Sequence, residues 1–317
     1  MDRKVISIIG CGMVGRSWAL SFARGGYGVK IYDRDPSIAE TAVLAVRQSA
    51  QELQELDLLD GQDVGAVCDR ISIGKDLEHA VDGSDYIQEN TPESVAVKVA
   101  VFKDLDRLAS ADTVIASSTS ALLPSSFTQE LDHAERCLVV HPLNPPHLIP
   151  AVELVPSPAT NHATVSRAMA ILKKAGQRPI LVTREIEGFL MNRLQGAMLD
   201  EAFAMVAGGY ASAEDVDAAV RDGLARRWSF MGPFETIDLN APDGIADFIK
   251  RYGPAYTSIG KDRPLRHNWD GEVAELVIAD RRRELPAERI RQRQQWRDRR
   301  LASLAAYARA AKDELGD

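Results

Sequence analysis

Two side chains suited to acid–base chemistry lie twelve positions apart, each in apolar surroundings. His141 follows the apolar run at residues 137–140, and Glu153 interrupts the apolar run at residues 152–155. A neutral imidazole near pH 7 can take the proton of a hydroxyl group that is being oxidised. A carboxylate in an apolar strand is costly unless it is paired, and pairing with His141 would fix the tautomer of the ring. On spacing alone, a structural histidine and an edge-strand glutamate remain an equal alternative.

Two other chemistries have weaker support in the sequence. A serine hydrolase of the nucleophile-elbow type would need G-x-S-x-G, which is missing. His141 and His147 lie six residues apart in a proline-rich segment, but no cluster of cysteines or acids completes a metal site. We therefore predict no bound metal.

A glycine-rich turn stands between an apolar run and a helical stretch. The segment Gly10-Cys11-Gly12-Met13-Val14-Gly15 has the spacing G-x-G-x-x-G. Gly10 permits the tight turn, Gly12 lets the backbone approach a pyrophosphate, and Gly15 lets the helix pack closely on the sheet. The helix N-terminus then faces the phosphate charge. We assign all three glycines, with Met13 and Val14, to a dinucleotide site.

Asp33 decides which dinucleotide is expected. It lies eighteen residues after Gly15, at the end of the second apolar run. Its carboxylate would accept hydrogen bonds from the adenosine ribose hydroxyls and repel a ribose phosphate, which favours NAD over NADP. A solvated loop acid is the alternative, and the neighbouring Arg34 weakens the discrimination. The predicted cofactor is NAD.

Strands that alternate with helices must position these residues. Strand-like apolar runs occur at residues 4–9, 29–33, 71–73, 86–87, 114–116, 138–140 and 180–182. This alternation predicts an α/β fold, a Rossmann-type doubly wound sheet in residues 1–185. An all-α C-terminal domain is expected for residues 186–317. Ligands of such sheets bind beyond the carboxyl ends of the strands, where His141 stands.

Bulk composition excludes several classes of protein. The formal net charge of -8 argues against a nucleic-acid partner, which needs a basic surface. No run of eighteen apolar residues occurs, so no membrane span is expected. The scattered Cys11, Cys68 and Cys137 form no disulfide framework and indicate reduced thiols, hence a cytoplasmic protein.

Further motifs resemble those of the 3-hydroxyacyl-CoA dehydrogenase superfamily. They are Ser117-Ser118-Thr119-Ser120, His141-Pro142-Leu143-Asn144-Pro145 and Gly188-Phe189-Leu190-Met191-Asn192-Arg193. The resemblance implies an active site of Ser120, His141, Glu153 and Asn192. Ser120 and Asn192 would hydrogen-bond the substrate oxygen, His141 would take the proton, and Glu153 would orient the histidine. It also implies a homodimer built through the helical domain.

The same resemblance implies additional contacts to the nicotinamide ribose or ring. They fall on Glu93, Lys98, Ser118 and Asn144. Without the resemblance, Glu93 and Lys98 would be interpreted as an ordinary solvated helix face.

Within the superfamily, the chain is most similar to the L-gulonate 3-dehydrogenase, or lambda-crystallin, branch. The residues that carry this likeness include Gly15-Arg16-Ser17-Trp18-Ala19, Asn144-Pro145-Pro146, Gly232-Pro233-Phe234-Glu235-Thr236, Leu239-Asn240-Ala241 and Gln295-Trp296-Arg297-Asp298. This branch implies that a hydroxy acid is oxidised, with L-gulonate as the leading candidate. A non-catalytic NAD-binding protein is the alternative from another class.

The charge of residues 48–69 bears on the substrate. This stretch holds no Lys or Arg but six acids, which would repel the phosphates of coenzyme A. A small carboxylate needs one cation instead, and Arg227 is the candidate because the gulonate branch has an arginine at the matching place. A solvated helix end at Arg226 and Arg227 is the alternative. A 3-hydroxybutyryl-CoA substrate stays open, as does carnitine held in a cage of Trp228, Phe230 and Tyr252.

Overall fold

The computed structural model describes residues 4–261, 275, 278–279, 282–283 and 286–316. By its contacts the chain divides into two compact units. The first unit joins the residues up to Asn192 with those from Trp296 onward, and the second runs from Arg193 to Gln295. The predicted domain limits, 1–185 and 186–317, stay a prediction.

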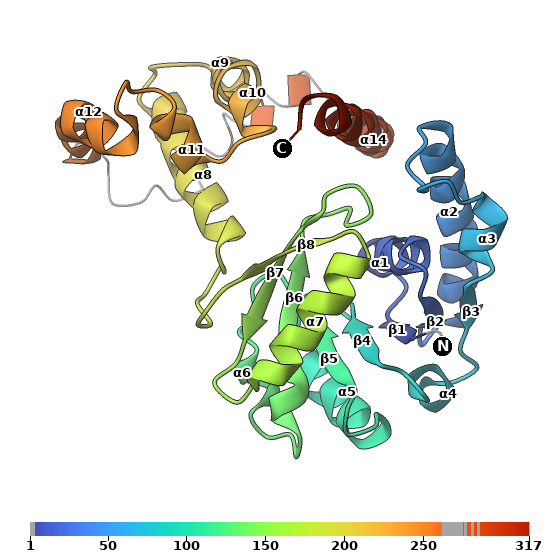
Figure 1. Cartoon of the computed structure of the whole chain (residues 1–317). Helices are drawn as coiled ribbons and strands as arrows, with labels where there is room; N and C mark the ends of the chain where they lie inside the picture. The colour runs from blue at the N-terminus through green and yellow to red at the C-terminus, as the bar shows by residue number, and fades with distance from the viewer. Residues whose placement is uncertain (1–3, 262–274, 276–277, 280–281, 284–285, 317) are drawn as a thin grey trace. The chain divides into compact units, whose positions relative to one another are not determined.

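The first unit is built on one eight-stranded sheet (Figure 1). Its strands are β1 (Val5–Ile9), β2 (Gly28–Tyr32), β3 (Ile71–Ile73), β4 (Tyr86–Glu89), β5 (Val114–Ser117), β6 (Cys137–Pro142), β7 (Ala151–Pro156) and β8 (Arg178–Leu181). The order is β3-β2-β1-β4-β5-β6-β7-β8. The first six strands are parallel, β7 is antiparallel to β6, and β8 is parallel to β7. The predicted doubly wound sheet is confirmed.

Helices lie in every connection between consecutive strands except the one from β6 to β7. They are α1 (Met13–Arg24), α2 (Pro36–Glu55), α3 (Val64–Cys68), α4 (Leu77–Val81), α5 (Val95–Leu108), α6 (Ser125–Thr128), the 3-10 turn η1 (Ala134–Arg136) and α7 (His162–Lys174). Local capping sets where several of them begin. Asp35 accepts a hydrogen bond from the amide of Ser37 at the start of α2, and Asn161 accepts one from Thr164 at the start of α7.

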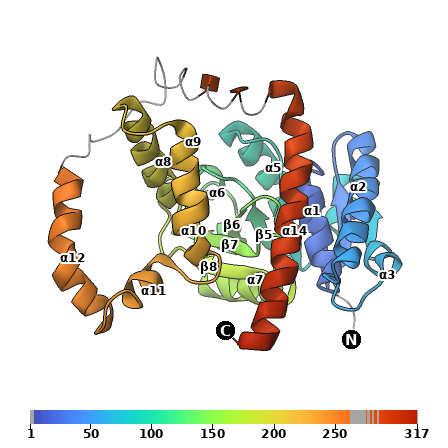
Figure 2. The ribbon, with the colours of Figure 1, turned by 90° about the horizontal axis from the view of Figure 1, so that it is seen from above.

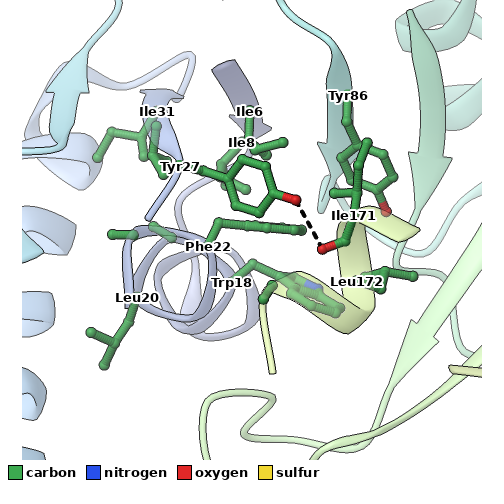
Figure 3. Close-up of a cluster of buried hydrophobic side chains, with 14 of the residues drawn as sticks. Ile6, Ile8, Trp18, Leu20, Phe22, Tyr27, Ile31, Tyr86, Ile171 and Leu172 are labelled. Carbon is green, nitrogen blue, oxygen red and sulfur yellow. Dashed lines mark hydrogen bonds between the residues drawn. The ribbon is translucent and has the colours of Figure 1, made fainter. Parts of the chain in front are cut away.

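Both faces of the central strands are buried, as a parallel sheet requires, while the edge strands β3 and β8 are partly exposed. On one face, Ile6 and Ile8 of β1 pack in a cluster with α1 and α7; on the other, Ile9 and Ile87 pack with Phe102 of α5. Figure 3 shows part of the first cluster, where the ring of Trp18 stacks on Phe22 at a centroid distance of 5.3 Å. The hydroxyl of Tyr27 donates to the carbonyl of Ile171 at 3.2 Å, which ties the turn after α1 to α7.

The last helix, α14 (Ile290–Leu315), returns to the first unit from Trp296 onward. Ala302 is buried in the cluster formed by α1, α2 and α7, and Ala305 packs against it. Arg309 forms ion pairs with Asp57 at 3.4 Å and Asp60 at 3.1 Å. The helix that carries Arg309, α14, is the long red helix in Figure 2. The first unit is therefore assembled from two separate stretches of the chain.

The described residues of the second unit form helices joined by turns, with no strand among them. The unit contains most of α8 (Met191–Ala207), then α9 (Ala213–Ala218), the π-helical turn η2 (Ala219–Leu224), α10 (Ala225–Trp228), α11 (Pro233–Asp238), α12 (Gly244–Lys261) and the 3-10 turn η3 (Ala287–Arg289). The predicted all-α character of the C-terminal part is confirmed. Across the described ranges, no helix is both long enough and apolar enough to cross a membrane.

Candidate active site

The two residues singled out for acid–base chemistry are direct neighbours across two strands. His141 on β6 and Glu153 on β7 are register partners of the antiparallel pair. Such partners present their side chains on the same face, about 5 Å apart at Cβ. His141 Nδ1 lies 2.7 Å from Glu153 Oε2, with the histidine 5% and the glutamate 0% exposed. The short connection between β6 and β7 thus creates the pair.

The second carboxylate oxygen of Glu153 is also occupied. Oε1 accepts hydrogen bonds from the backbone amides of Leu190 at 2.6 Å and Met191 at 2.8 Å, where α8 begins. Amides at a helix N-terminus favour negative charge. The preceding turn uses positive φ angles at Gly188 (75°) and Phe189 (50°), and the Phe189 ring packs 5.6 Å from that of His141. The carboxylate is therefore held from two sides.

This arrangement determines which nitrogen of His141 is free to react. A carboxylate only accepts hydrogen bonds, so Nδ1 of His141 carries the hydrogen and donates it to Glu153. The lone pair of the neutral ring then lies on Nε2. An imidazole in this tautomer is prepared to accept a proton from a hydroxyl group.

Ser120, Asn192 and Glu93 meet beside this pair of strands. Asn192 Nδ2 donates to the backbone carbonyl of Ser120 at 2.7 Å. Glu93 Oε1 accepts from the Ser120 amide at 3.0 Å, from its hydroxyl at 3.3 Å and from Thr119 Oγ1 at 2.6 Å. Partial burial raises the pKa of Glu93, but these bonds, the Ala121 amide and the charge of Lys98 outweigh it, so the pKa lies below its ordinary value. Glu93 therefore fixes the Ser120 turn as an ionised carboxylate.

The glycine turn has the geometry that a dinucleotide needs. Gly10 has a φ of 90°, and a Cβ there would lie 2.8 Å from the carbonyl oxygen of Asn90. A Cβ on Gly15 would lie 1.9 Å from the carbonyl oxygen of Gly10, so only glycine lets α1 start so close to β1. A Cβ on Gly12 would meet nothing within 4 Å, which leaves its backbone open to a ligand. Asp33 Oδ2 accepts from the amide of Cys11 at 2.8 Å and braces the turn.

Asn144 lies against the same turn. Its Nδ2 lies 3.1 Å from Sδ of Met13, whose side chain is 48% exposed, while Val14 is half-buried. Asn144 Oδ1 is buried and has no hydrogen-bond partner among the described residues. A buried acceptor of this kind is costly unless a ligand or water satisfies it. An N–H group of a bound dinucleotide fits this requirement.

Two residues predicted to contact the cofactor are already fully engaged. Lys98 is 1% exposed, and its ammonium donates to both carboxylate oxygens of Glu89, at 2.9 and 3.0 Å, and to the carbonyl of Thr91 at 3.0 Å. Ser118 Oγ donates to Asn90 and accepts from Trp18 and Gln88. A side-chain bond from Lys98 or Ser118 to the cofactor would replace one of these, so both roles stay predictions.

Sequence reasoning did not identify Gln88 and Glu89, which organise this part of the sheet. Both are 0% exposed at the end of β4. The available signal was two polar residues directly after the apolar Tyr86-Ile87, in a strand expected to be buried on both faces. Within the described residues, no group of three or more His, Cys, Asp or Glu side chains could hold a metal ion.

Arg227 belongs to the second unit, on α10. Its side chain is half-buried, and its guanidinium lies 3.5 Å from Asn240 Oδ1, whereas Arg226 is exposed. A role of Arg227 toward a substrate carboxylate stays a prediction.

Similarity to known proteins supports the same chemistry. Residues 5–186 match the family described as 3-hydroxyacyl-CoA dehydrogenase, NAD binding domain, and residues 188–275 match its C-terminal domain. The chain is 39% identical to the lambda-crystallin of Oryctolagus cuniculus over 96% of either chain. It is 35% identical to the L-carnitine dehydrogenase of Oceanobacillus iheyensis, over 80% of this chain and 81% of that one.

A solved structure shares the fold over nearly the whole chain. It is 5-formyl-3-hydroxy-2-methylpyridine 4-carboxylic acid 5-dehydrogenase, described as an NAD+-dependent dismutase. The TM-score is 0.83 at 27% identity, with 98% of this chain and 99% of that chain covered. The glycine turn, the buried His141–Glu153 pair and these matches agree: the chain belongs to the 3-hydroxyacyl-CoA dehydrogenase family and is an NAD-dependent dehydrogenase that acts on a hydroxyl group.

Proposed function

We propose that this dehydrogenase oxidises the 3-hydroxyl of a small hydroxy carboxylate, and that L-gulonate, which gives 3-dehydro-L-gulonate, is the leading candidate. The observation that carries the proposed chemistry is the buried pair of His141 and Glu153, with Nδ1 held at 2.7 Å. A base whose tautomer is fixed in advance suits removal of a proton from a secondary alcohol.

Each proposed catalytic residue has a distinct task. His141 takes the hydroxyl proton at Nε2, and Glu153 stabilises the imidazolium that results. Ser120 and Asn192, which lie together through the Asn192–Ser120 hydrogen bond, orient the substrate oxygen. NAD, when bound, accepts the hydride. We propose that Gly10, Gly12, Met13, Val14, Gly15 and Asp33 hold its phosphates and adenosine, and that Glu93, Lys98, Ser118 and Asn144 line its nicotinamide end.

The surface charge of residues 48–69 supports a substrate without coenzyme A. All six acids of this stretch are exposed, and Asp57 and Asp60 are the two that Arg309 pairs. The remaining negative charge would repel the phosphates of a thioester substrate. We propose that Arg227 supplies the cation for a substrate carboxylate, because its planar fork matches that group. The pyridine carboxylate named for the structural relative is likewise a small acid.

Steady-state assays with NAD test this proposal directly. We expect the kcat/KM for L-gulonate to exceed that for 3-hydroxybutyryl-CoA and for L-carnitine by at least about tenfold, which equals 1.4 kcal/mol in transition-state binding. Arg227→Met should raise the KM for the acid, whereas the exposed neighbour Arg226→Met serves as the matched control. A higher kcat/KM for the thioester would refute the assignment.

Carnitine is the second candidate, since an L-carnitine dehydrogenase is among the relatives. Trp228, Phe230 and Tyr252 of the second unit are exposed aromatic side chains that could bind a quaternary ammonium. Turnover of L-carnitine above that of L-gulonate, lost in Trp228→Leu but kept in Arg227→Met, would favour this alternative.

We further propose a homodimer and a cytoplasmic location. The exposed residues Ile249, Tyr252, Tyr256 and Ile259 recur at helical spacing on α12 and form an apolar stripe that a second copy would cover. The three cysteines are free and buried, as expected for a reducing compartment.

A further inference from the structure

One glutamine on β4 connects the cofactor side of the site with the strand that carries His141. Gln88 Nε2 donates to Ser118 Oγ at 2.7 Å and to the backbone carbonyl of Val140 at 3.2 Å. Val140 directly precedes His141 and lies one residue beyond the last register pair of β5 and β6, which is Ser117 with Val139. Gln88 therefore spans three strands at the point where β5 ends.

The orientation of this amide is fixed by a second buried residue. Tyr86, two positions earlier on the same face of β4, donates its hydroxyl to Gln88 Oε1 at 2.5 Å. Burial holds the pKa of Tyr86 well above its ordinary value, so the hydroxyl stays protonated and acts as a donor. With Oε1 engaged in this way, Nε2 is the end that faces the Val140 carbonyl, which can only accept.

Ser118 is held as completely as Gln88. Its hydroxyl donates to Asn90 Oδ1 at 2.7 Å and accepts from Gln88 and from Trp18 Nε1, at 3.0 Å. One donor and two lone pairs are thereby used. Asn90 is the residue whose carbonyl lies against Gly10 of the glycine turn. The chain of contacts runs from the glycine turn through Asn90 and Ser118 to Gln88 and Val140.

We propose that Gln88 is a positioning residue of this dehydrogenase, which sets the distance between the cofactor-binding turn and His141 by bonding to Ser118 and to the Val140 carbonyl. Gln88 touches neither of the groups proposed to react. Its neighbour Glu89 points to the opposite face of the sheet, where it bonds to Ser117 and Lys98, so it cannot replace Gln88. The proposal rests on the assignment of His141 as the base.

The test combines cofactor binding with kinetics in Gln88→Met, which keeps the length of the side chain but loses its hydrogen bonds. We expect about tenfold weaker NADH binding, measured by fluorescence, and about tenfold lower kcat, with an unchanged shape of the pH dependence of kcat. Gln62→Met is the matched control, since the Gln62 amide likewise makes three hydrogen bonds, to two backbone carbonyls and one side chain, but lies after α2. The control should change the thermal midpoint only.

A double-mutant cycle decides whether Gln88 acts through Ser118. Ser118→Ala and Gln88→Met should weaken NADH binding less than multiplicatively when combined, because they break the same contact. Tyr86→Phe removes only the orienting hydroxyl, so it should weaken NADH binding and lower kcat by about threefold each. It replaces Gln88→Met as the test variant if Gln88→Met does not fold. Unchanged NADH affinity and kcat in the folded variants, or fully multiplicative effects on binding, would overturn the proposal. NADH binding needs no substrate, so a wrong substrate assignment would leave this readout intact.

Discussion

The two compact units use their large apolar side chains in opposite ways. In the first unit, Trp18, Phe22 and Phe102 are completely buried against the sheet. In the second unit, Phe230 and Phe234 are each 75% exposed, and the buried residues among those described are small or medium in size. A sheet covered on both faces closes its own core, whereas the described helices of the second unit leave several large apolar side chains exposed. The comparison separates a unit with its own closed core from one whose exposed apolar side chains we propose a second copy covers.

The largest effect should come from His141, the proposed base in the first unit. We expect His141→Ala to lower kcat by about a thousandfold, the usual range for loss of a general base, while NADH affinity stays within about twofold. Turnover is followed by NADH absorbance and affinity by fluorescence. His162→Ala, at the exposed start of α7, is the control. Undiminished kcat in His141→Ala would mean that the chemistry does not lie in this unit's strand pair.

The second largest effect should come from Glu153→Gln. Its amide oxygen can still accept from the Leu190 and Met191 amides, but an amide nitrogen facing His141 Nδ1 cannot accept its hydrogen. We expect kcat to fall by about a hundredfold and the thermal midpoint to fall by several degrees, since the buried pair is broken. Thermal unfolding and steady-state kinetics measure the two effects. A variant with lowered stability but normal kcat would reduce Glu153 to a structural role.

The third prediction concerns the exposed apolar stripe of the second unit. Tyr256→Asp places a charge on the apolar stripe of α12 and should weaken the proposed dimer by at least about tenfold in Kd, with kcat per folded chain changed less than in His141→Ala. Analytical ultracentrifugation over a concentration series measures this. Lys250→Glu, on the other side of α12, is the control. A wild-type chain that stays monomeric would show that the exposed side chains serve another purpose.

How far the sequence predicts these features depends on the range of the interactions. The position of the glycine turn and the contact between His141 and Glu153 follow from local strand patterns and one short connection, and the structure has both. The roles of Asp33 toward the cofactor and of His141 and Glu153 in catalysis stay predictions. Lys98 differs because its surroundings depend on where α5 lies on the sheet, which no local pattern specifies. Its burial with Glu89 is therefore visible only in the fold. The return of α14 to the first unit is likewise a long-range contact that periodicity does not indicate.

The first unit also contains a half-buried histidine, His147, that should make the fold less stable in acid. Burial, with the nearby charges of Arg24 and Arg16, lowers the pKa of His147 from 6.5 to about 3. Its Nδ1 is buried without a partner among the described residues. Below pH 6.5 the unfolded chain gains a proton that the folded chain does not, so stability falls as the pH drops from 6.5 toward 3. The limit is about 1.4 kcal/mol per pH unit, and we expect roughly half because the ring is partly exposed.

Urea unfolding at pH 7 and pH 5 checks this expectation. His147→Asn should lose less stability between the two pH values than the wild-type chain, by about 1 kcal/mol. His162→Asn, which changes an exposed histidine, should behave like the wild type. Equal acid sensitivity in His147→Asn and the wild type would assign the effect to other groups.

The smallest effect should come from the ion pairs that join α14 to the first unit. Arg309 is 35% exposed at the side chain, and its partners Asp57 and Asp60 are 92% and 67% exposed. Exposed pairs contribute little, so Arg309→Ala should lower the free energy of unfolding by less than about 1 kcal/mol. Ala302→Asp should cost more, because it puts a charge into the buried contact between α14 and the core. Urea unfolding of both variants ranks the two contacts. A larger loss in Arg309→Ala would mean that charge, and not the closed core, holds the returning helix in place.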